Sequence, residues 1–363
     1  MGANIVVGSF WGDEGKGIVS AWQTFRTKAI GVFRGCGGSN PEHGMFLGDY
    51  YLKVNQLPLG FILQECLIGI GPGTAVSVEK FLYEVKRFRL TPDKVRVDYR
   101  CPIITRKNVD EEKKSAHMKN IGGTISGTGI AMSHAALRIA PLAQDIEELK
   151  PYLDDIPRLA NDLAKRGLVS LEGTQGTFLS RYHGDYPNVT SVDVTAPSII
   201  AGVGLNWRSV NDVFACVKTL PTREGAGPMG NIEEFTPKEM EELGIIEYSS
   251  IIDPETGKYQ VRRKAKGIDY DLLSRVVALN GANKIALTFA EQYDQKVKDA
   301  TKWSELSDKV KNLIAEIEER ANVEVTIINT GKQFTSMVSK HDDLPTITDS
   351  MMQRLQSYTW GNK

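Results

Sequence analysis

The chain has 363 residues, enough for one large α/β domain or two ordinary ones. Its 41% apolar and 25% charged residues are typical of a soluble globular protein, and the net charge of −1 gives no electrostatic reason to bind nucleic acid or a membrane. No run approaches the roughly 18 apolar residues of a membrane span. The N-terminus leads directly into a strand pattern, so we expect no signal peptide. Four widely spaced cysteines argue against disulfides or a zinc site and favour the reducing cytoplasm.

The first predicted strand, residues 5–7, leads into a glycine-rich segment that reads Gly8-Ser-Phe-Trp-Gly-Asp-Glu-Gly-Lys-Gly17. A helix-like run over residues 18–25 follows it. Glycines at this position free backbone N–H groups to cradle a phosphate at the helix N-terminus, and Lys16 adds a positive charge. Asp13 does not suit a plain anion site because a carboxylate repels phosphate. It therefore indicates a metal ligand or a proton acceptor, and the segment predicts nucleotide chemistry.

This segment departs from two better-known motifs. The standard phosphate loop requires Ser or Thr after Gly-Lys, whereas Gly17 follows Lys16 here and offers no hydroxyl for magnesium. The spacing of the glycines is also wrong for the dinucleotide-binding fingerprint. The structural alternative is a glycine-rich turn between a strand and a helix, with its charges in solvent.

A second cluster follows the predicted strand 29–33 and reads Arg34-Gly-Cys-Gly-Gly-Ser-Asn-Pro-Glu-His43. It lies at the carboxyl end of a strand, where α/β proteins build their sites. His43 is one of five histidines and is a candidate general acid at this position. A lone histidine is more often structural or exposed, and that alternative stays open at this point.

Further along the chain, a helix is predicted over residues 109–119, with Asn108 and Glu111 as its capping pair. The Gly/Ser/Thr-rich segment 121–129 follows and is a second candidate phosphate cradle, with Arg138 beyond it on a predicted helix. When this segment is considered alone, we interpret it as an ordinary loop.

The remaining elements complete an α/β pattern. The apolar stripe of a predicted helix over residues 303–320 is interpreted as core packing. Short apolar runs without alternation suit strands buried on both faces, as in a parallel sheet. These runs cover residues 5–7, 29–33, 67–70, 95–97, 168–171, 213–217, 284–287 and 323–328.

The sequence therefore predicts an α/β fold with a central, mostly parallel sheet flanked by helices. We expect residues 1–363 to form a single large domain, with a loop-rich insertion around residues 225–266, where Gly, Pro and charged residues gather.

Four motifs occur in an order that resembles the adenylosuccinate synthetase family. They are Trp-Gly-Asp-Glu-Gly-Lys-Gly at 11–17, Glu-Gly-x-Gln-Gly-Thr at 172–177, Tyr-Pro-x-Val-Thr-Ser at 186–191 and Thr-Arg-x-Gly-Ala-Gly-Pro at 222–228. The resemblance runs from near residue 4 to about residue 331. It implies a fold related to the phosphate-loop NTPases. It also implies a ligase that joins L-aspartate to C6 of a purine nucleoside monophosphate, after a nucleoside triphosphate has phosphorylated the purine O6.

The resemblance assigns roles to individual residues. Asp13 would be the general base and a Mg²⁺ ligand, and His43 the acid that stabilises charge around the transferring phosphoryl group. Residues matched to the triphosphate phosphates are Gly12, Gly15, Lys16 and Gly17, with Lys16 also counted as catalytic. Residues matched to the substrate nucleotide are Asn40, Thr124, Gln175 and Thr190. Arg138 matches an arginine that reaches across a dimer interface to the substrate phosphate, which implies a homodimer. Arg262 and Arg263 are candidates for the aspartate carboxylates.

Several positions depart from the family pattern. The family's Asn-Ala-Gly-His-Thr is Asn40-Pro-Glu-His-Gly44 here, so Glu42 replaces a glycine whose carbonyl helps to hold magnesium. The guanine-reading Thr-Lys-x-Asp becomes Thr288-Phe-Ala-Glu291, and the second base-contacting turn ends in Gly331-Lys332. Phe289 removes the lysine and could stack on any purine, so ATP or dATP joins GTP as a candidate phosphoryl donor.

Glu224 replaces a usual valine next to the substrate nucleoside, and an extra acceptor there could receive a 2-amino N–H. Guanine carries that group and inosine does not. These departures favour the phage branch of the family, the 2-aminoadenylosuccinate synthetases, which use dGMP and would act in the host cytoplasm. Retention of Asp13 favours the ordinary enzyme, which uses IMP and GTP in AMP biosynthesis. Non-catalytic nucleotide binding and a GTPase-type switch are alternatives from other classes.

Overall fold

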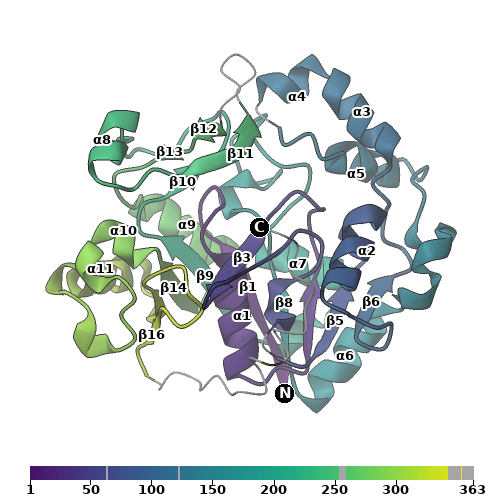
Figure 1. The fold of residues 1–363 in the computed structure, drawn as a ribbon, viewed down its shortest axis with the longest axis horizontal. Coiled ribbons are helices and arrows are strands. Elements are labelled where there is room, and N and C mark those ends of the chain that lie inside the picture. The colour runs from purple at the N-terminus through teal and green to yellow at the C-terminus, as the bar shows by residue number, and fades with distance from the viewer. Residues whose placement is uncertain (63, 122, 253–258, 342–352, 354–363) are drawn as a thin grey trace.

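The computed structural model describes residues 1–62, 64–121, 123–252, 259–341 and 353. A ten-stranded sheet runs through the molecule, and all its neighbouring strands pair in parallel except β15 with β16 (Figure 1). Its strands in spatial order are β16 (Met337–Ser339), β15 (Val325–Asn329), β14 (Lys284–Thr288), β9 (Val210–Lys218), β1 (Gly2–Gly8), β8 (Leu168–Glu172), β2 (Gly31–Arg34), β5 (Leu67–Ile70), β6 (Val95–Asp98) and β7 (Leu153–Asp154). The predicted α/β class and the mostly parallel sheet are confirmed, and each of the eight predicted runs is a strand of this sheet.

The two faces of the sheet bury separate apolar cores. Ile5 and Val7 of β1 belong to one core, whereas Val6 between them belongs to the other, because successive side chains of a strand point to opposite faces. Helices α1 (Lys16–Arg26) and α2 (Val78–Arg87) pack on the Val6 face. The opposite face is covered by α6 (Ile156–Arg166), α7 (Ala196–Val203), α9 (Tyr270–Asn280) and α11 (Asp308–Ala321).

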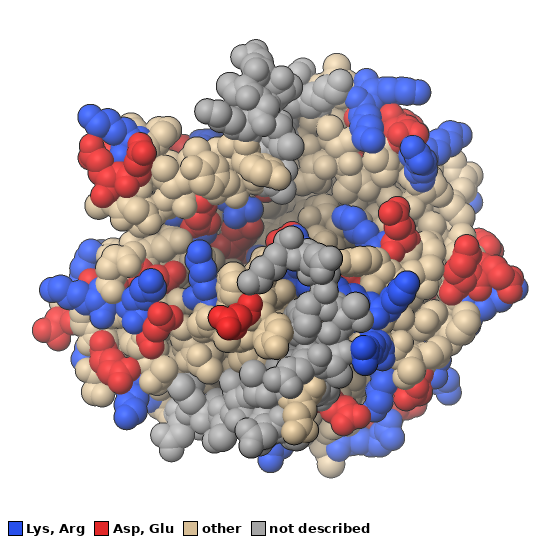
Figure 2. Space-filling model, in the orientation of Figure 1, with Lys and Arg blue, Asp and Glu red and all other residues tan. Residues whose placement is uncertain are grey.

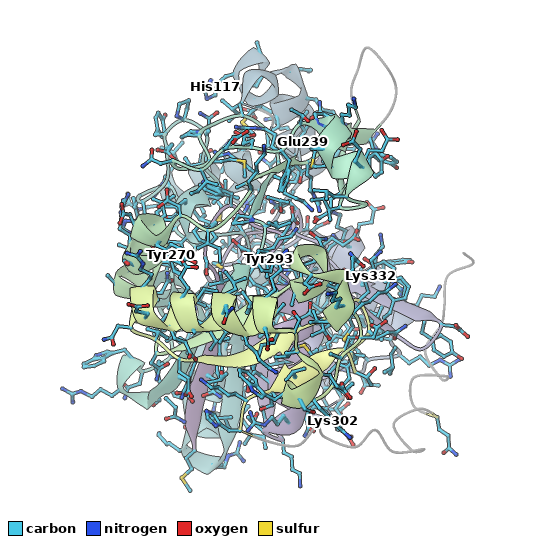
Figure 3. The ribbon with its side chains drawn as sticks, turned by 90° about the vertical axis from the view of Figure 1, so that its left-hand side faces the viewer. His117, Glu239, Tyr270, Tyr293, Lys302 and Lys332 are labelled. Atoms are coloured by element: carbon cyan, nitrogen blue, oxygen red, sulfur yellow. The ribbon has the colours of Figure 1, made fainter. Side chains whose placement is uncertain are left out.

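The helix predicted over residues 303–320 begins later than expected. Ser307 caps α11 by accepting the N–H of Val310 at 3.3 Å, and Trp303 lies in a separate 3₁₀ turn (Trp303–Glu305). The buried stripe of α11 packs in the core, as predicted. Figure 3 shows Tyr270 of α9 and Tyr293 of α10 (Ala290–Tyr293) beside this helix.

The helix predicted over residues 109–119 is two helices, α3 (Arg106–Lys114) and α4 (Ala116–Asn120), and its predicted cap is wrong. Thr105 is the N-cap, because its hydroxyl accepts the N–H of Asn108 at 3.2 Å while Asn108 Oδ1 accepts the N–H of Thr105 at 2.8 Å. Asn108 is therefore the third residue of α3 rather than its cap, and Glu111 takes no part in the capping box. Ser115, with ψ of 113°, ends α3.

Small elements surround the sheet. The hairpin β3 (His43–Leu47) and β4 (Tyr50–Val54) follows the second glycine-rich cluster, and α5 (Thr128–Ala136) follows the third. The region around 225–266 carries α8 (Pro237–Glu242) and two strand pairs, β10 (Thr222–Arg223) with β13 (Arg263–Lys264) and β11 (Tyr248–Ile252) with β12 (Tyr259–Val261). Of the helices in the described part of the chain, none has the length and apolarity needed to cross a bilayer.

Candidate active site

The glycine-rich loop 9–15 joins the carboxyl end of β1, in the middle of the sheet, to α1. A fully buried carboxylate sets its shape: Glu14 accepts the N–H groups of Phe10 at 2.6 Å and Gly12 at 3.2 Å. The same carboxylate binds Lys16 Nζ at 2.9 Å, so the lysine is held inside the loop. Burial lowers the pKa of Lys16, but Glu14 outweighs it and the pKa lies above its ordinary value, which keeps this amine charged.

The start of α1 suits an anion. Gly15 is its N-cap in a left-handed conformation with φ of 69°, and no side chain caps the first turn. The N–H groups of a helix's first turn and its dipole favour a phosphate at such a position. Asp13, also left-handed with φ of 56°, presents its carboxylate on the outside of the same loop, where its side chain is 32% exposed.

His43 is held by a buried ionic pair from two other strands. Its Nδ1 lies 2.6 Å from Glu172 Oε1, at the end of β8, and the same oxygen accepts a hydrogen bond from Arg34 of β2 at 3.0 Å. The N–H of Leu59 donates to Glu172 as well, at 2.8 Å. Arg34 and Glu172 are fully buried, so His43 rests on a rigid base.

The protonation of His43 follows from this arrangement. Burial lowers the pKa of His43 by more than Glu172 raises it, so the free protein holds a neutral imidazole. A neutral ring that donates Nδ1–H to Glu172 leaves Nε2 as an acceptor, and Nε2 is buried without a hydrogen-bond partner among the described residues. An arriving phosphate anion would favour the protonated ring and make Nε2–H a donor.

Asp13 faces an arginine from the small strand pairs. Arg262 Nε lies 3.1 Å from Asp13 Oδ2, and its other nitrogens lie 3.9 Å from Glu224 and 3.7 Å from Glu247. Burial lowers the pKa of Arg262, but these carboxylates outweigh it and raise the pKa above its ordinary value. Figure 2 shows acidic and basic side chains gathered in a hollow on this face of the molecule.

The loop after β8 approaches the glycine-rich loop. A Cβ on Gly176 would lie 2.4 Å from Phe10 O, so only glycine permits this contact. Gln175 donates to Thr190 Oγ1 at 2.9 Å, which joins two residues matched to the substrate nucleotide. Gln175 Oε1 is a buried acceptor that lacks a partner in the described part of the chain, and so is Asn40 Oδ1 in the loop before β3.

A family model and the sequences of known proteins show which family the chain resembles. The family model for adenylosuccinate synthetase matches residues 5–148 and 138–295. The adenylosuccinate synthetase of Methanocaldococcus jannaschii is 40% identical over 94% of this chain and 97% of its own, and that of Archaeoglobus fulgidus is 39% identical over 93% and 98%. The chain belongs to the adenylosuccinate synthetase family. It is accordingly a carbon–nitrogen ligase, as the motifs predicted.

Two solved structures share the fold. Fully ligated adenylosuccinate synthetase from Plasmodium falciparum matches with a TM-score of 0.82 and 20% identity, over 94% of this chain and 100% of its own. The cyanophage S-2L succinoaminodeoxyadenylate synthetase, bound to dGMP and dATP, matches with a TM-score of 0.76 and 24% identity, over 99% and 98%. At these identities the likeness shows the fold alone. The phage branch that the sequence analysis favoured is therefore less well supported than the ordinary synthetase, whose archaeal members are 39–40% identical to this chain.

The structure brings together the two segments that the sequence analysis matched to the donor base, around Phe289 and Gly331. Asn329 accepts the N–H of Phe289 at 3.3 Å and donates to Gly331 O at 2.7 Å. Lys218 Nζ lies 4.3 Å from the centre of the Phe289 ring, so a cation already covers one face of the ring that was expected to stack on a purine. Glu291 Oε2 is buried without a partner among the described residues, and burial raises the pKa of Glu291.

The structure gives four other predicted residues no contact with the glycine-rich loop among the interactions described above. Arg263 binds Glu234 and donates to Gly227 O at 2.6 Å, so its donors are engaged within the loop. The carboxylate of Glu42 binds Lys53 Nζ of β4 at 2.9 Å, which turns it toward the β3–β4 hairpin, and the backbone carbonyl of Glu42 remains the predicted magnesium ligand. Arg138 lies in the turn after α5, with φ of 63°, rather than on a helix, because α5 ends at Ala136. Thr124 is exposed.

Residues 123–127 form a loop that leads into α5, in line with the interpretation of this segment as an ordinary loop. The amides of Gly127, at the end of this loop, and of Gly129, in the first turn of α5, donate to the carboxylate of Glu112 on α3, at 2.6 Å and 2.9 Å. A carboxylate therefore occupies donors that a phosphate would need. The role of Thr124 in this loop stays a prediction.

Sequence reasoning missed a buried charge cluster behind Arg262. Glu247 accepts hydrogen bonds from Lys218 at 2.7 Å and Lys264 at 2.8 Å, and Gln292 joins both Glu247 and Lys264. The cluster links Arg262, next to Asp13, with Lys218, next to Phe289. Lys264 directly follows Arg262 and Arg263, the two arginines that the sequence analysis singled out, but no local pattern marks Glu247 as its partner.

The closeness of α1 and His43 explains the unusual Gly17. A Cβ on Gly17 would lie 2.7 Å from His43 Cβ and 3.1 Å from Leu59 Cδ2. Gly17→Ala should therefore displace the His43 ring and lower kcat by about 10²-fold, since a 1 Å misplacement can cost that much. Steady-state kinetics would measure this. Gly267→Ala is the matched control, because nothing lies within 4 Å of its added Cβ. Unchanged kcat in Gly17→Ala would refute the need for His43 in this position.

Proposed function

We propose that this ligase joins L-aspartate to C6 of IMP with hydrolysis of GTP, the adenylosuccinate reaction of its family. The main support is that Asp13 and His43 flank one phosphate-binding loop, with His43 packed on Gly17 and Asp13 paired with Arg262. A carboxylate outside the loop and an imidazole beside the first turn of α1 are the pair needed to move a proton and to stabilise a phosphoryl group.

The proposed chemistry has two steps. Asp13 takes the N1 proton, and O6 then bonds to the γ-phosphorus as the bond to the diphosphate breaks. The aspartate amine next bonds to C6, the C6–O6 bond breaks, and O6 leaves as part of phosphate, which carries away the proton that the amine gives up. His43 Nε2–H would donate to the transferring group, while Lys16 and the first turn of α1 hold phosphate oxygens. Arg262 is the better placed of the two arginines to bind the aspartate carboxylates.

A magnesium ion fits this residue set. Mg²⁺ in nucleotide sites is bound through one or two carboxylates together with substrate phosphates and water. Asp13 supplies one carboxylate beside the phosphate loop, and the backbone carbonyl of Glu42 is the second candidate. When bound, the ion would neutralise charge on the triphosphate.

The chain's assembly as a homodimer is part of the proposal. Leu137 and Ile139 are 67% and 65% exposed, so two exposed apolar side chains flank Arg138 in the sequence, the residue that the resemblance matches to an arginine reaching across a dimer interface. Sedimentation velocity should give a dimer, and Arg138→Ala should weaken nucleotide binding without unfolding the chain. A monomer at micromolar concentration would contradict this.

The dGMP reaction is a second candidate, because the Glu224 carboxylate lies 3.9 Å from Arg262 and Glu224 is the residue that the resemblance matches to a position next to the substrate nucleoside. Phosphate release decides between the two. Purified protein with aspartate and Mg²⁺ would be given IMP or dGMP, each with GTP, ATP or dATP. We expect the highest kcat/KM with IMP and GTP. A higher value with dGMP would overturn the main proposal in favour of the second, and triphosphate hydrolysis without monophosphate and aspartate would overturn both.

Glu224 itself can be tested by the ratio of the two substrates. Glu224→Val should lower kcat/KM for dGMP about tenfold, the loss expected for one hydrogen bond to a charged acceptor, and leave IMP nearly unchanged. Glu224→Gln is the matched control, because its amide oxygen keeps an acceptor. An unchanged dGMP/IMP ratio in Glu224→Val would remove Glu224 from substrate choice.

A further inference from the structure

Two fully buried lysines, Lys218 and Lys264, converge on one carboxylate beside Arg262. No step of the proposed chemistry uses either lysine, although lysines are almost never fully buried without a partner. We infer that both are positioning residues for the aspartate substrate: they occupy the Glu247 carboxylate and so leave the guanidinium of Arg262 to the substrate carboxylates. The inference rests on the proposed function, because it takes Arg262 as the residue that binds aspartate.

Both oxygens of the Glu247 carboxylate already accept hydrogen bonds. Oε2 accepts from Lys218 Nζ at 2.7 Å, and Oε1 accepts from Lys264 Nζ at 2.8 Å and from Gln292 Nε2 at 2.9 Å. Burial raises the pKa of Glu247, but the two lysines outweigh it and hold the pKa below its ordinary value. The carboxylate therefore stays ionised, and its charge is offset from the side away from the substrate.

Lys264 is itself held in one orientation. Besides Glu247, its Nζ donates to Ile245 O at 2.6 Å and to Gln292 Oε1 at 2.8 Å, which uses all three N–H bonds of an ammonium group. These partners come from α10 and from the loop before β11. Burial lowers the pKa of Lys264, and Glu247 offsets part of this cost. The Glu247 carboxylate therefore cannot turn toward Arg262 without breaking these bonds.

Arg262 lies next to the Glu247 carboxylate without a hydrogen bond to it. The backbone N–H of Arg262 donates to Glu247 O at 2.8 Å, which ties the two residues together, yet Arg262 Nη1 lies 3.7 Å from Glu247 Oε2, the oxygen that Lys218 holds. Arg262 Nε, 3.1 Å from Asp13 Oδ2, also has no hydrogen-bond partner within the described residues. A guanidinium kept near carboxylates but not bonded to Glu247 is ready for bidentate binding of another carboxylate.

Loss of Lys264 would make Glu247 a competitor of the substrate for Arg262. The Glu247 carboxylate would keep a single lysine, and a buried carboxylate is stabilised by a second cation close by. The 3.7 Å approach of Arg262 would then close to a direct ion pair, and the incoming aspartate would meet a further uncompensated charge beside Asp13 and Glu224. Aspartate binding should weaken, while the residues that transfer the phosphoryl group stay in place.

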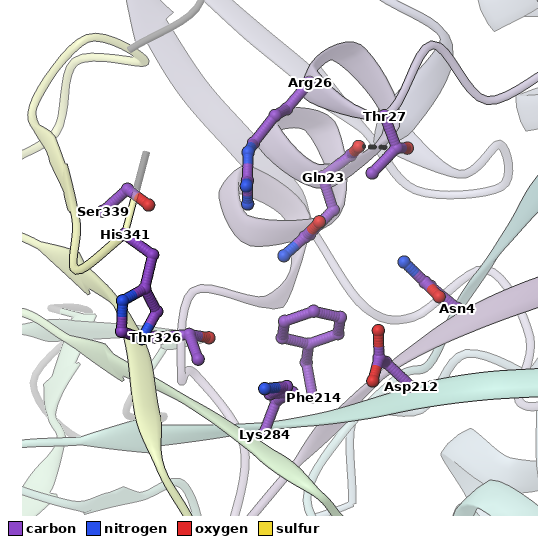
Figure 4. A pocket seen from close by; sticks show the side chains of 10 residues that line it. All are labelled: Asn4, Gln23, Arg26, Thr27, Asp212, Phe214, Lys284, Thr326, Ser339 and His341. Atoms are coloured by element: carbon purple, nitrogen blue, oxygen red, sulfur yellow. Dashed lines mark hydrogen bonds between the residues drawn. The ribbon is translucent and has the colours of Figure 1, made fainter. Parts of the chain in front are cut away.

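Lys264→Met tests this role by a split between KM and kcat. It should raise the KM for L-aspartate about tenfold, as for the loss of one hydrogen bond between charged groups, and leave kcat and the KM for the monophosphate within about threefold. Phosphate release by the full chain measures all three. Lys284→Met is the matched control, because Lys284 lies beside Phe214 in a cavity at the amino end of β14 (Figure 4) and binds Glu324 at 3.4 Å. An unchanged KM for aspartate in Lys264→Met would overturn the inference.

A second substitution separates this role from a purely structural one. Glu247→Gln added to Lys264→Met removes the competing charge, so the KM for aspartate should return to within about threefold of the unaltered chain. A double variant as weak as Lys264→Met would overturn the inference. If thermal unfolding shows that Lys264→Met does not fold, Lys218→Met with and without Glu247→Gln provides the same comparison. Phosphate release that does not depend on aspartate in the unaltered chain would refute the proposed function itself, and the inference with it.

Discussion

Asp13→Asn should lower turnover by about 10²- to 10⁴-fold, the range that a positioned general base contributes. The amide cannot take the N1 proton of a 6-oxopurine, and it is a poorer ligand for Mg²⁺. The fold should not suffer, because the Asp13 side chain is 32% exposed and its partner Arg262 keeps the carboxylates of Glu224 and Glu247 nearby. Phosphate release under saturating substrates measures kcat, and thermal unfolding checks the fold.

The control for this variant is Asp162→Asn. Asp162 carries an exposed carboxylate on α6, 3.4 Å from Lys165, and has no contact with the site. It should keep full turnover. If Asp13→Asn retained turnover within about threefold of the unaltered chain, well below the range for a general base, then the proton acceptor would have to be another group.

The parts of the fold that could be predicted are those whose cause is local. The eight central strands are buried on both faces, so each appears in the sequence as an unbroken apolar run. The edge strands β7 and β16, of two and three residues, have no such pattern and were missed. The cap of α3 was misplaced because Asn108 is a good capping residue in isolation, and only the structure shows that Thr105 begins the helix.

In the candidate site, too, the residues within local motifs could be predicted and their distant partners could not. Asp13, Lys16 and His43 stand in recognisable motifs, and the structure gathers them around one loop. Their partners could not be predicted, because the relevant neighbours come from distant parts of the chain: Arg34 and Glu172 are separated by 138 residues. The same holds for Phe289, whose ring the sequence left open to a purine and the structure places against Lys218.

Glu172→Gln should cost stability and activity together. Its carboxylate is fully buried and accepts from Arg34, His43 and the Leu59 N–H. Removal of its charge leaves the Arg34 guanidinium buried without a counter-ion, which costs about 3–5 kcal/mol in comparable buried pairs. Urea unfolding measures the free energy, and kcat should also fall because a neutral amide stabilises the protonated His43 ring less than the carboxylate does. Glu241→Gln, on the exposed side of α8, should be neutral in both measurements.

The dependence of this loss on pH separates a charge effect from a packing effect. Burial raises the pKa of Glu172, but His43 and Arg34 outweigh it and hold the pKa below its ordinary value of 4.5. The folded chain therefore binds this proton less readily than the unfolded chain. Its stabilisation is complete above the unfolded pKa and is lost as the pH falls through the lower, folded pKa. The difference in unfolding free energy between the unaltered chain and Glu172→Gln should thus be constant near neutral pH and shrink below about 4.5. A difference that stays the same from pH 7 to pH 3 would mean that shape, rather than the ionised carboxylate, holds Arg34 and His43 in place.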